Sequence, residues 1–398
     1  MKPIVPAENT LHVRYAIRDI VVYANKLKQE KDLQVLSLNI GDPCKFDFSP
    51  PAHTVESIYK AMRENHNGYS PAYGIPEALE ALNREAGRKG LRDVKHIFVT
   101  TGASEAIEIC LTSLLNKGDN VLIPYPQYPL YSAVINKLGA QANPYLLAED
   151  NDWQPNMADM AARVNDKTRA IVVINPNNPT GSVYSKEVLK DIIALAKQHG
   201  LLIFADEIYD KLILDDRPFH SLASLDSEAP VVTFGGLAKN FIAPGWRIGW
   251  GYITGAGELV HDYSEAVSRL LRARLCANHP MQFAIQPALE GPQDHIEAVR
   301  EKLRRRRDIM ADWIARIDHL SVVKPAAAFY AFPRIALDVD DEQFVKGLLA
   351  ETGVLVVPGK GFGQAEGSAH FRLVYLPQED VLHQAFARIE EYIRKHYG

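Results

Sequence analysis

The sequence predicts an α/β fold, with a large domain built on a mostly parallel β-sheet and a smaller α+β domain beside it. Between about residues 53 and 290, short apolar runs alternate with helical patterns, and each run is bounded by Gly, Pro, Asn or Asp. The runs are almost continuously apolar, as in strands that are buried on both faces of a parallel sheet. After residue 291 this alternation stops, which indicates a second, smaller unit.

The individual elements follow from local patterns. The β-rich runs are HIFVTTG, DNVLIP, RAIVVINPNNP, GLLIFADE, VVTFGG and IGWGYI. Helical periodicity predicts helices over residues 13–31, about 293–317 and 341–351, and in SEAIEICLTSLLNKG and KEVLKDIIALAKQHG. We expect a large domain over residues 45–291 and a small domain that combines residues 1–44 with 292–398, because both segments flank the central block and chain termini often lie close together.

Composition is typical of an ordinary globular protein. The 398 residues are 47% hydrophobic and 23% charged, with a formal net charge of −5, which argues against nucleic acid or an anionic membrane as partner. The basic run Arg304–Arg307 is interpreted as the solvated side of an amphipathic helix. Cys44, Cys110 and Cys276 have no zinc spacing, so we expect reduced thiols and no metal. Without a signal peptide or a membrane-spanning run, a cytoplasmic location is expected.

Polar side chains follow several of the predicted strands, where ligands bind in open α/β sheets. The segment TTGASEA joins a strand to a helix, so the backbone at Ala103 and Ser104 could hold a phosphate on free N–H groups. A plain helix cap at Ser104 is an equal alternative.

Two further strands end in side chains that suit an aromatic cofactor. IVVINPNNPTG ends in Asn178, whose amide can donate to a phenolate oxygen, although a simple turn also explains this segment. LLIFADEIYD places Asp206 after five apolar residues, and Tyr209 follows three positions later. A buried carboxylate is costly unless a cation such as a pyridinium N–H pairs with it. A helix cap is the alternative role for Asp206.

Lys239 lies on the turn after the apolar run 231–234, eight residues before Arg247. A desolvated lysine exposes a neutral amine that attacks carbonyls, and an arginine clamps phosphate. Alone, this lysine would be interpreted as a surface residue. Phosphate cradle, amide, carboxylate, lysine and arginine together are what pyridoxal 5′-phosphate (PLP) requires. Arg372 lies in a later apolar run, where its guanidinium suits either a substrate carboxylate or a structural salt bridge.

The motifs NIGDP, YSPAYGIPEALEAL, TTGASEA, PYPQYPLY, NPNNPTG, ADEIYD, LAKNFIAPGWRIGW and HFRL extend over nearly the whole chain. With them the chain resembles the fold-type I, class I/II PLP-dependent aminotransferases. This resemblance implies a seven-stranded, mostly parallel sheet in the large domain. The segments IGDPCKFDFSPP, EDNDWQP and KGFGQAEGSAHFRL look most like microbial alanine aminotransferases.

The resemblance implies a role for each motif residue. Lys239 would form the Schiff base and carry the proton, Asp206 would pair with the ring nitrogen, and Tyr128 would stack on the ring. The phosphate would be held by Ala103, Ser104 and Arg247. The ring oxygen would be bound by Asn178 and Tyr209. The substrate carboxylate would be bound by Arg372, Asn178 and Gly41.

The resemblance also implies a homodimer, in which Tyr69 would reach the phosphate in the neighbouring subunit. Tyr15 and Arg18 are candidates for contacts to the substrate, including a second carboxylate. Gly236 departs from the family pattern, because many relatives have serine there to contact phosphate, although alanine-type enzymes often have glycine. Ala238 also replaces a common serine. The segment 359–363 is interpreted as a mobile loop near the substrate rather than a dinucleotide site.

The implied activity is ping-pong transamination of L-alanine with 2-oxoglutarate, giving pyruvate and L-glutamate. An aspartate, aromatic or broad-specificity aminotransferase is the alternative, and a PLP β-lyase is a further one. A nicotinamide-dependent dehydrogenase is disfavoured because the Gly-rich fingerprint is missing. A ligand-sensing regulator is disfavoured because about 44 residues before the core leave no room for a DNA-binding segment.

Overall fold

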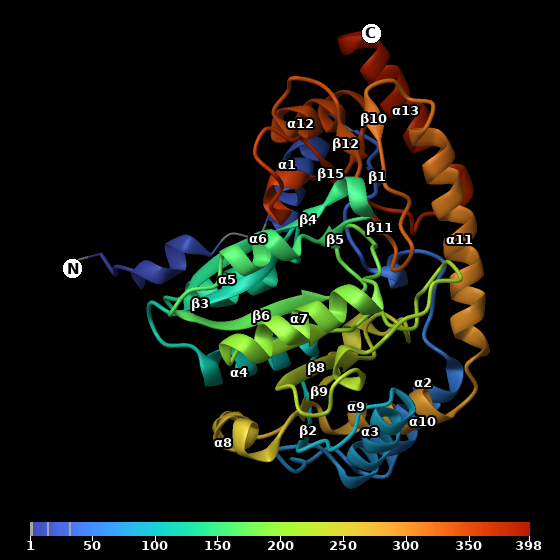
Figure 1. The fold of residues 1–398 in the computed structure, drawn as a ribbon. Helices are drawn as coiled ribbons and strands as arrows, with labels where there is room; N and C mark the ends of the chain where they lie inside the picture. The colour runs from blue at the N-terminus through green and yellow to red at the C-terminus, as the bar shows by residue number, and fades with distance from the viewer. Residues whose placement is uncertain (1–2, 14–15, 32) are drawn as a thin grey trace.

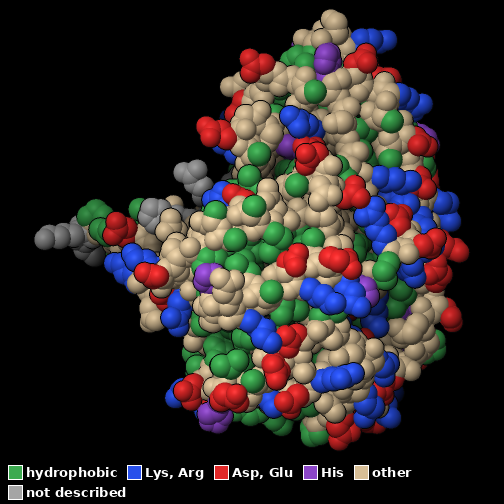
Figure 2. Space-filling view, in the orientation of Figure 1, with side chains coloured by type: hydrophobic (Ala, Val, Ile, Leu, Met, Phe, Trp, Pro, Cys, Tyr) green, Lys and Arg blue, Asp and Glu red, His purple; other side chains and the backbone are tan. Residues whose placement is uncertain are grey.

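The computed structural model describes residues 3–13, 16–31 and 33–398. The substrate candidates Tyr15 and the side chain of Arg18 lie outside this described part. In the described part, no helix combines the length and the apolar character that crossing a bilayer requires. The three cysteines are free. Acidic and basic side chains are interspersed on the face seen in Figure 2.

A central sheet of eight strands forms the core of the larger part of the molecule (Figure 1). Its order is β2-β9-β8-β7-β6-β3-β4-β5. The strands are β2 (His96–Thr100), β3 (Asn120–Tyr125), β4 (Gln141–Ala148), β5 (Gln154–Pro155), β6 (Thr168–Ile174), β7 (Leu202–Asp206), β8 (Val231–Gly236) and β9 (Gly249–Thr254). The pairs from β4 through β3, β6 and β7 to β8 are parallel, whereas β9 runs antiparallel to β8 and β2. The mostly parallel sheet is therefore confirmed.

The expected number of seven strands is corrected to eight. The additional strand, β5, has only two residues and pairs antiparallel with the end of β4. A segment of two residues is too short to show the alternating pattern that predicts a strand.

Both faces of the sheet are buried, as the apolar runs predicted. Neighbouring residues of β6 alternate between two core clusters, with Ile171 and Val173 in one and Val172 and Ile174 in the other. One cluster is completed by α4 (Ala103–Leu114), α5 (Leu130–Lys137) and α8 (Gly257–Ala273). The other includes residues of α6 (Met157–Ala162) and α7 (Lys186–His199). Because the central strands run parallel, their carboxyl ends lie at one common edge of this layered sheet.

The remaining helices pack at the two ends of the molecule. At one end lie α2 (Ala52–Arg63), α3 (Pro76–Arg88), α9 (His279–Gln282) and α10 (Ile285–Glu290) (Figure 1). From there the long helix α11 (Asp294–Ile314) leads to the C-terminal elements. These are β10 (Leu320–Ser321), β11 (Tyr330–Ala331), β12 (Arg334–Ile335), α12 (Asp341–Thr352), β13 (Val354–Leu355), β14 (Val357–Pro358), β15 (Phe371–Val374) and α13 (Glu379–Tyr397).

The N-terminal segment joins these C-terminal elements. After α1 (Ala16–Lys31), the strand β1 (Leu36–Ser37) pairs in parallel with β13, with Leu36 opposite Val354. The contact agrees with the expected association of the two ends of the chain. The domain boundaries at residues 44 and 291 stay a prediction.

The arginine run on α11 was wrongly interpreted as solvated. Arg306 and Arg307 are only 1% and 4% exposed. Arg306 pairs with Asp47 at 2.8 Å and donates to a backbone carbonyl, whereas Arg307 pairs with Asp215 and donates to a second carbonyl. Arg305 does remain on the solvated side. An amphipathic pattern cannot distinguish a solvated charge from one that is buried against loop carbonyls and carboxylates.

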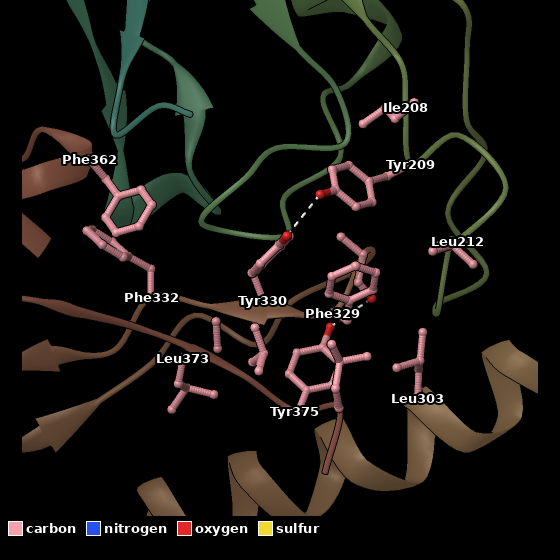
Figure 3. Close-up of a cluster of buried hydrophobic side chains, with 14 of the residues drawn as sticks. Ile208, Tyr209, Leu212, Leu303, Phe329, Tyr330, Phe332, Phe362, Leu373 and Tyr375 are labelled. Atoms are coloured by element: carbon pink, nitrogen blue, oxygen red, sulfur yellow. Dashed lines mark hydrogen bonds between the residues drawn. The ribbon is translucent and has the colours of Figure 1, made fainter. Parts of the chain in front are cut away.

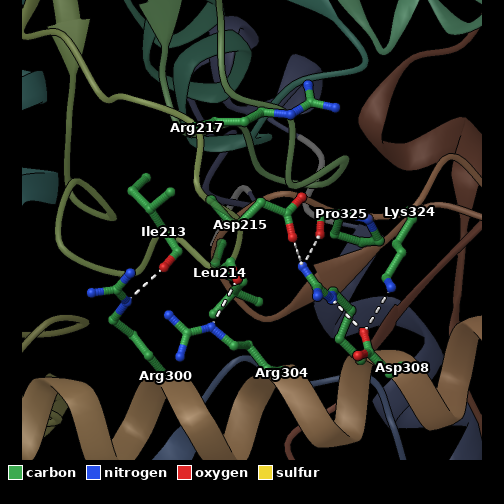
Figure 4. Close-up of polar contacts among 12 residues, drawn as sticks. Ile213, Leu214, Asp215, Arg217, Arg300, Arg304, Asp308, Lys324 and Pro325 are labelled. Atoms are coloured by element: carbon green, nitrogen blue, oxygen red, sulfur yellow. Dashed lines mark hydrogen bonds and ion pairs between the residues drawn. The ribbon is translucent and has the colours of Figure 1, made fainter.

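Two neighbouring arginines on α11 act in the same way (Figure 4). Arg300 donates to the carbonyl oxygen of Ile213 at 2.6 Å, and Arg304 donates to that of Leu214 at 2.8 Å. Helix α11 therefore holds the 213–215 segment by charge-assisted hydrogen bonds.

We expect Arg306→Ala to lower the free energy of unfolding by about 2 kcal/mol, because it leaves the carbonyl oxygen of Leu376 without its cationic donor and leaves Asp47 with Lys302 as its remaining cationic partner. Urea denaturation measures this change. The matched variant Arg305→Ala removes a guanidinium from the solvated side and should cost at most about 0.5 kcal/mol. Equal effects of the two substitutions would contradict a structural role for the buried arginine.

Candidate active site

Three adjacent parallel strands bring the predicted polar residues to one edge of the sheet. Asp206 is the last residue of β7. Asn178 follows the end of β6 by four residues, and Lys239 follows the end of β8 by three. Because β7 lies between β6 and β8, all three side chains start from neighbouring strand ends. The sheet topology, not sequence proximity, assembles them.

Asp206 is a buried carboxylate whose hydrogen-bond donors, among the residues that the structure describes, are neutral. It is 4% exposed, and it accepts from the hydroxyl of Tyr131 at 3.0 Å and from the backbone N–H of Ile208 at 3.4 Å. Burial raises the pKa of Asp206 to about 6, although both hydrogen bonds and the nearby charge of Lys239 oppose this shift. A cationic group beside the carboxylate would remove the cost of burying its charge.

Lys239 points its amine into an aromatic surrounding. Its Nζ donates to the carbonyl oxygen of Gly41 at 2.9 Å. It lies 5.4 Å from the ring centre of Phe329 and 6.0 Å from that of Tyr209. The amine is therefore held by one backbone carbonyl and lies near two aromatic rings.

Two tyrosines join the sheet edge to the C-terminal elements (Figure 3). The hydroxyl of Tyr209, in the turn after β7, donates to the hydroxyl of Tyr330 on β11 at 3.1 Å. A Cβ atom on Gly41 would lie only 1.9 Å from that Tyr330 oxygen. Glycine is thus required at position 41 if the NIGDP segment is to approach the tyrosine pair.

Arg372 lies on β15 and faces the same site. It is 1% exposed and donates to the carbonyl oxygen of Asn39 at 2.7 Å and to Oδ1 of Asn178 at 3.3 Å. Its guanidinium carbon lies 4.7 Å from the ring centre of Tyr330 and 4.6 Å from that of Phe362. Two aromatic faces therefore orient the planar guanidinium group.

Phe362 belongs to a segment that the sequence suggested was a mobile loop. The structure instead forms a short 3₁₀ helix, η6 (Gly359–Phe362), in which the Phe362 side chain is buried. The carbonyl oxygen of Phe362 accepts a hydrogen bond from the backbone N–H of Gln127 at 2.8 Å. The segment therefore has regular structure and lies against Arg372, whereas its expected position near the substrate stays a prediction.

The predicted phosphate cradle brings Arg247 against the start of α4. Gly102 is the N-cap residue of α4, with a φ of 79°, so Ser104 is not the cap. A Cβ atom on Gly102 would lie 2.4 Å from Nη2 of Arg247, and a Cβ atom on Gly249 would lie 2.2 Å from the backbone nitrogen of Ala103. Both glycines are needed for this close approach, which joins a guanidinium group to the free N–H groups of a helix start.

The other site residues have distinct environments. Tyr128 is half-buried and packs against both core clusters. Tyr69 is 82% exposed. At Gly236, a Cβ atom would lie 2.9 Å from the carbonyl oxygen of Ile248, so a serine would require the backbone to shift. The departure from the family pattern at this position therefore has a steric reason.

The sequence did not predict the roles of Tyr131, Tyr330 and Phe362. Tyr131 lies on α5, whereas Tyr128, three residues earlier, precedes this helix, so helical spacing gave no signal that the two side chains share a direction. Tyr330 and Phe362 come from segments far from the sheet edge in sequence, and only tertiary packing places them there.

Comparisons with known proteins identify the family of the chain. Residues 34–389 match the family model for aminotransferase class I and II. The chain is 39% identical to the glutamate-pyruvate aminotransferase AlaA of Haemophilus influenzae over 96% of both chains. It is 41% identical to the alanine aminotransferase of Mycobacterium tuberculosis, over 96% of this chain and 90% of the relative.

A solved alanine aminotransferase from Pyrococcus furiosus superposes with a TM-score of 0.95 at 39% identity, covering 98% of this chain and all of the other. Similarity to enzymes named for other amino acids is lower. Mouse tyrosine aminotransferase is 30% identical over 94% of this chain and 84% of the relative. A solved Thermus thermophilus aspartate aminotransferase variant is 29% identical, with a TM-score of 0.89, over 98% of this chain and all of the other. This chain belongs to the class I and II aminotransferase family.

Proposed function

We propose that the protein is a PLP-dependent alanine aminotransferase that converts L-alanine and 2-oxoglutarate into pyruvate and L-glutamate. The observation that carries the proposal is the buried carboxylate of Asp206 beside the amine of Lys239 at one sheet edge. The choice of alanine is supported by relatives named for alanine or glutamate-pyruvate at 37–41% identity, against 30% or less for those named for tyrosine or aspartate.

The residues of the site fit PLP. The start of α4 and Arg247 offer N–H donors and a positive charge to a phosphate, and the missing Cβ of Gly102 lets the Arg247 guanidinium approach the helix start. Asp206 offers a carboxylate to a protonated ring nitrogen. When bound, PLP supplies an aldehyde for the lysine amine and a ring that withdraws electrons from the substrate Cα.

The protein groups then divide the remaining work. Lys239 Nζ is the base that takes the Cα proton and returns it, because it is the basic group next to the Gly41 carbonyl at the centre of the site. Asp206 holds the proton on the ring nitrogen. Asn178 and Tyr209 orient the ring through its oxygen, and Tyr128 stacks on it. Each of these roles is part of the proposal.

Arg372 is proposed to bind the α-carboxylate of the amino acid, together with Asn178 and the Gly41 backbone. A guanidinium fork held between Tyr330 and Phe362 has a fixed plane, which suits bidentate binding of a carboxylate. Every amino donor and oxo acid carries this group, so the contact serves both half-reactions.

We also propose a homodimer. The exposed side chains Val55, Tyr59 and Met62 follow one another at helical spacing on α2 and are 46%, 62% and 40% exposed. Tyr69 and Leu275, at 82% and 58%, are further large exposed apolar side chains. Apolar side chains exposed along one helix face are typical of a protein interface. A second subunit bound to this surface would bring Tyr69 within reach of the phosphate in that subunit. The molecular mass in solution tests whether the dimer forms.

A screen of amino acids against pyruvate and 2-oxoglutarate tests the function. With PLP and 2-oxoglutarate, we expect L-alanine among the best donors, and borohydride should fix the cofactor to Lys239. Lys239→Ala should lose at least about 10⁴-fold in kcat, because the covalent and proton-carrying group is removed. A preference for aspartate or an aromatic amino acid would contradict alanine as the proposed substrate. A wild-type enzyme that does not transaminate would contradict the proposed function.

The elevated pKa of Asp206 predicts a pH-dependent stability of the PLP-free protein. Its folded-state pKa of about 6 lies above the ordinary aspartate value of 3.8, so its contribution is favourable below about pH 4 and is lost as the pH rises through 6. Asp206→Asn should therefore be more stable than the wild type by up to about 3 kcal/mol near pH 7.5. Urea denaturation should show this gap closing towards pH 4, and a constant gap would contradict the prediction.

We expect Arg372→Ala to raise KM for all amino donors by about 10- to 100-fold, because a charge-assisted contact to the α-carboxylate is lost. PLP affinity should change by less than about 3-fold. Arg372→Lys keeps the charge without the planar fork, so its KM should lie between the values of the wild type and Arg372→Ala. If donor and cofactor binding weaken equally, Arg372 has a structural role instead.

A further inference from the structure

A buried ionic cluster lies directly behind the two reactive residues. We call Lys89, Glu207, Asp210 and Asn240 the Lys89 cluster. Nζ of Lys89 lies 2.6 Å from Glu207 and 2.8 Å from Asp210. The amide nitrogen of Asn240 donates to the other oxygen of Asp210 at 2.6 Å. The side chains of Lys89, Glu207 and Asp210 are only 13%, 2% and 12% exposed, and the Asn240 residue is 4% exposed.

The sequence positions of the cluster connect it to the reaction. Glu207 directly follows Asp206, and Asn240 directly follows Lys239. Asp210 lies in the turn after β7, whereas Asn240 lies in the turn after β8. The Asp210–Asn240 hydrogen bond therefore joins the turn that carries the reactive carboxylate to the turn that carries the reactive amine.

The sheet alone does not fix the relative position of these two turns. The backbone pairing of β7 with β8 ends at Asp206 and Phe234, five residues before Lys239. Beyond it, the lysine turn adopts left-handed backbone at Ile242 and Arg247, with φ of 54° at both. A link between side chains is the direct way to hold a turn of this kind against its neighbour.

Stability is a poor explanation for the cluster. It buries two carboxylates and one ammonium group, and such groups often contribute less to folding than apolar residues of equal size. The protein supplies further donors, because Glu207 accepts from the hydroxyl of Ser221 and from the backbone N–H of Leu222, both at 2.9 Å. The side-chain oxygen of Asn240, however, is buried without a hydrogen-bond partner among the described residues, which adds a further cost to the cluster. Contacts that are kept at such a cost are better explained by a role in fixing geometry.

We propose that Lys89, Asp210 and Asn240 are positioning residues that fix the amine of Lys239 relative to the carboxylate of Asp206. Lys89 comes from the C-terminal end of α3 and holds the two acidic side chains of the β7 turn. Asp210, oriented by this contact, then holds the lysine turn through Asn240. The inference rests on the proposed function, since it assumes that Lys239 and Asp206 act together.

A swap of the two linked side chains tests the proposal in the holoenzyme. Asn240→Asp places two carboxylates in contact and should lower kcat by about 10- to 100-fold, because small misplacements of a reacting group cost about this much. KM for the amino donor should change by less than about 3-fold. The double variant Asp210→Asn/Asn240→Asp restores the hydrogen bond with reversed polarity and should recover at least about 5-fold of the lost kcat.

Two controls separate positioning from folding. Lys211→Met removes the neighbouring lysine, which pairs with Glu85 at 3.0 Å, and should leave kcat unchanged. PLP affinity of the apo-protein should weaken in Asn240→Asp and return in the swap. An active wild type with an equally active Asn240→Asp variant, or a swap without recovery, would overturn the proposal. A wild type without transaminase activity would instead overturn the proposed function.

Discussion

A carboxylate at the end of a buried strand, whose hydrogen-bond donors in the described part of the chain are uncharged, is the constraint on which this site depends. Asp206 is held by a tyrosine hydroxyl and a backbone N–H, which orient the carboxylate but do not neutralise it. Burial therefore raises its pKa to about 6, and the folded protein bears the cost of the charge until a cation arrives. In the proposed function, the protonated ring nitrogen of PLP is the partner that would neutralise this charge. Cofactor binding and stability of the fold should consequently be coupled at this one residue.

Arg372 shows how the second half of the site depends on the chain ends. The arginine lies on β15 near the C-terminus, yet its guanidinium donates to Asn39 near the N-terminus and to Asn178 beside the central sheet. The β1–β13 pairing and the glycine at position 41 make this convergence possible. Substrate binding at Arg372 would thus act on three segments that are far apart in sequence.

The sequence predicted the parts of the structure that local patterns encode. The strands β6, β7 and β8 were visible as apolar runs, and the polar residues that end them were found because strand ends of a parallel sheet meet at one edge. Partners across the fold were not visible. Nothing near Asp206 in sequence indicates Tyr131, and an amphipathic pattern could not show that Arg306 and Arg307 are buried. The domain boundaries and the cytoplasmic location stay predictions.

The buried arginines of α11, Arg306 and Arg307, and the Lys89 cluster have the same physical origin. Both are charges buried between segments that the backbone alone does not connect: Arg306 against Asp47, Arg307 against Asp215, and the turn after β7 against the turn after β8. A lysine or arginine can reach several loop oxygens from one helix, whereas an apolar side chain there would pack without selecting a unique arrangement. Charges of this kind are expensive to bury, so they concentrate where geometry matters more than stability. In this chain such places lie around the reactive lysine and along the helix that joins the two parts of the molecule.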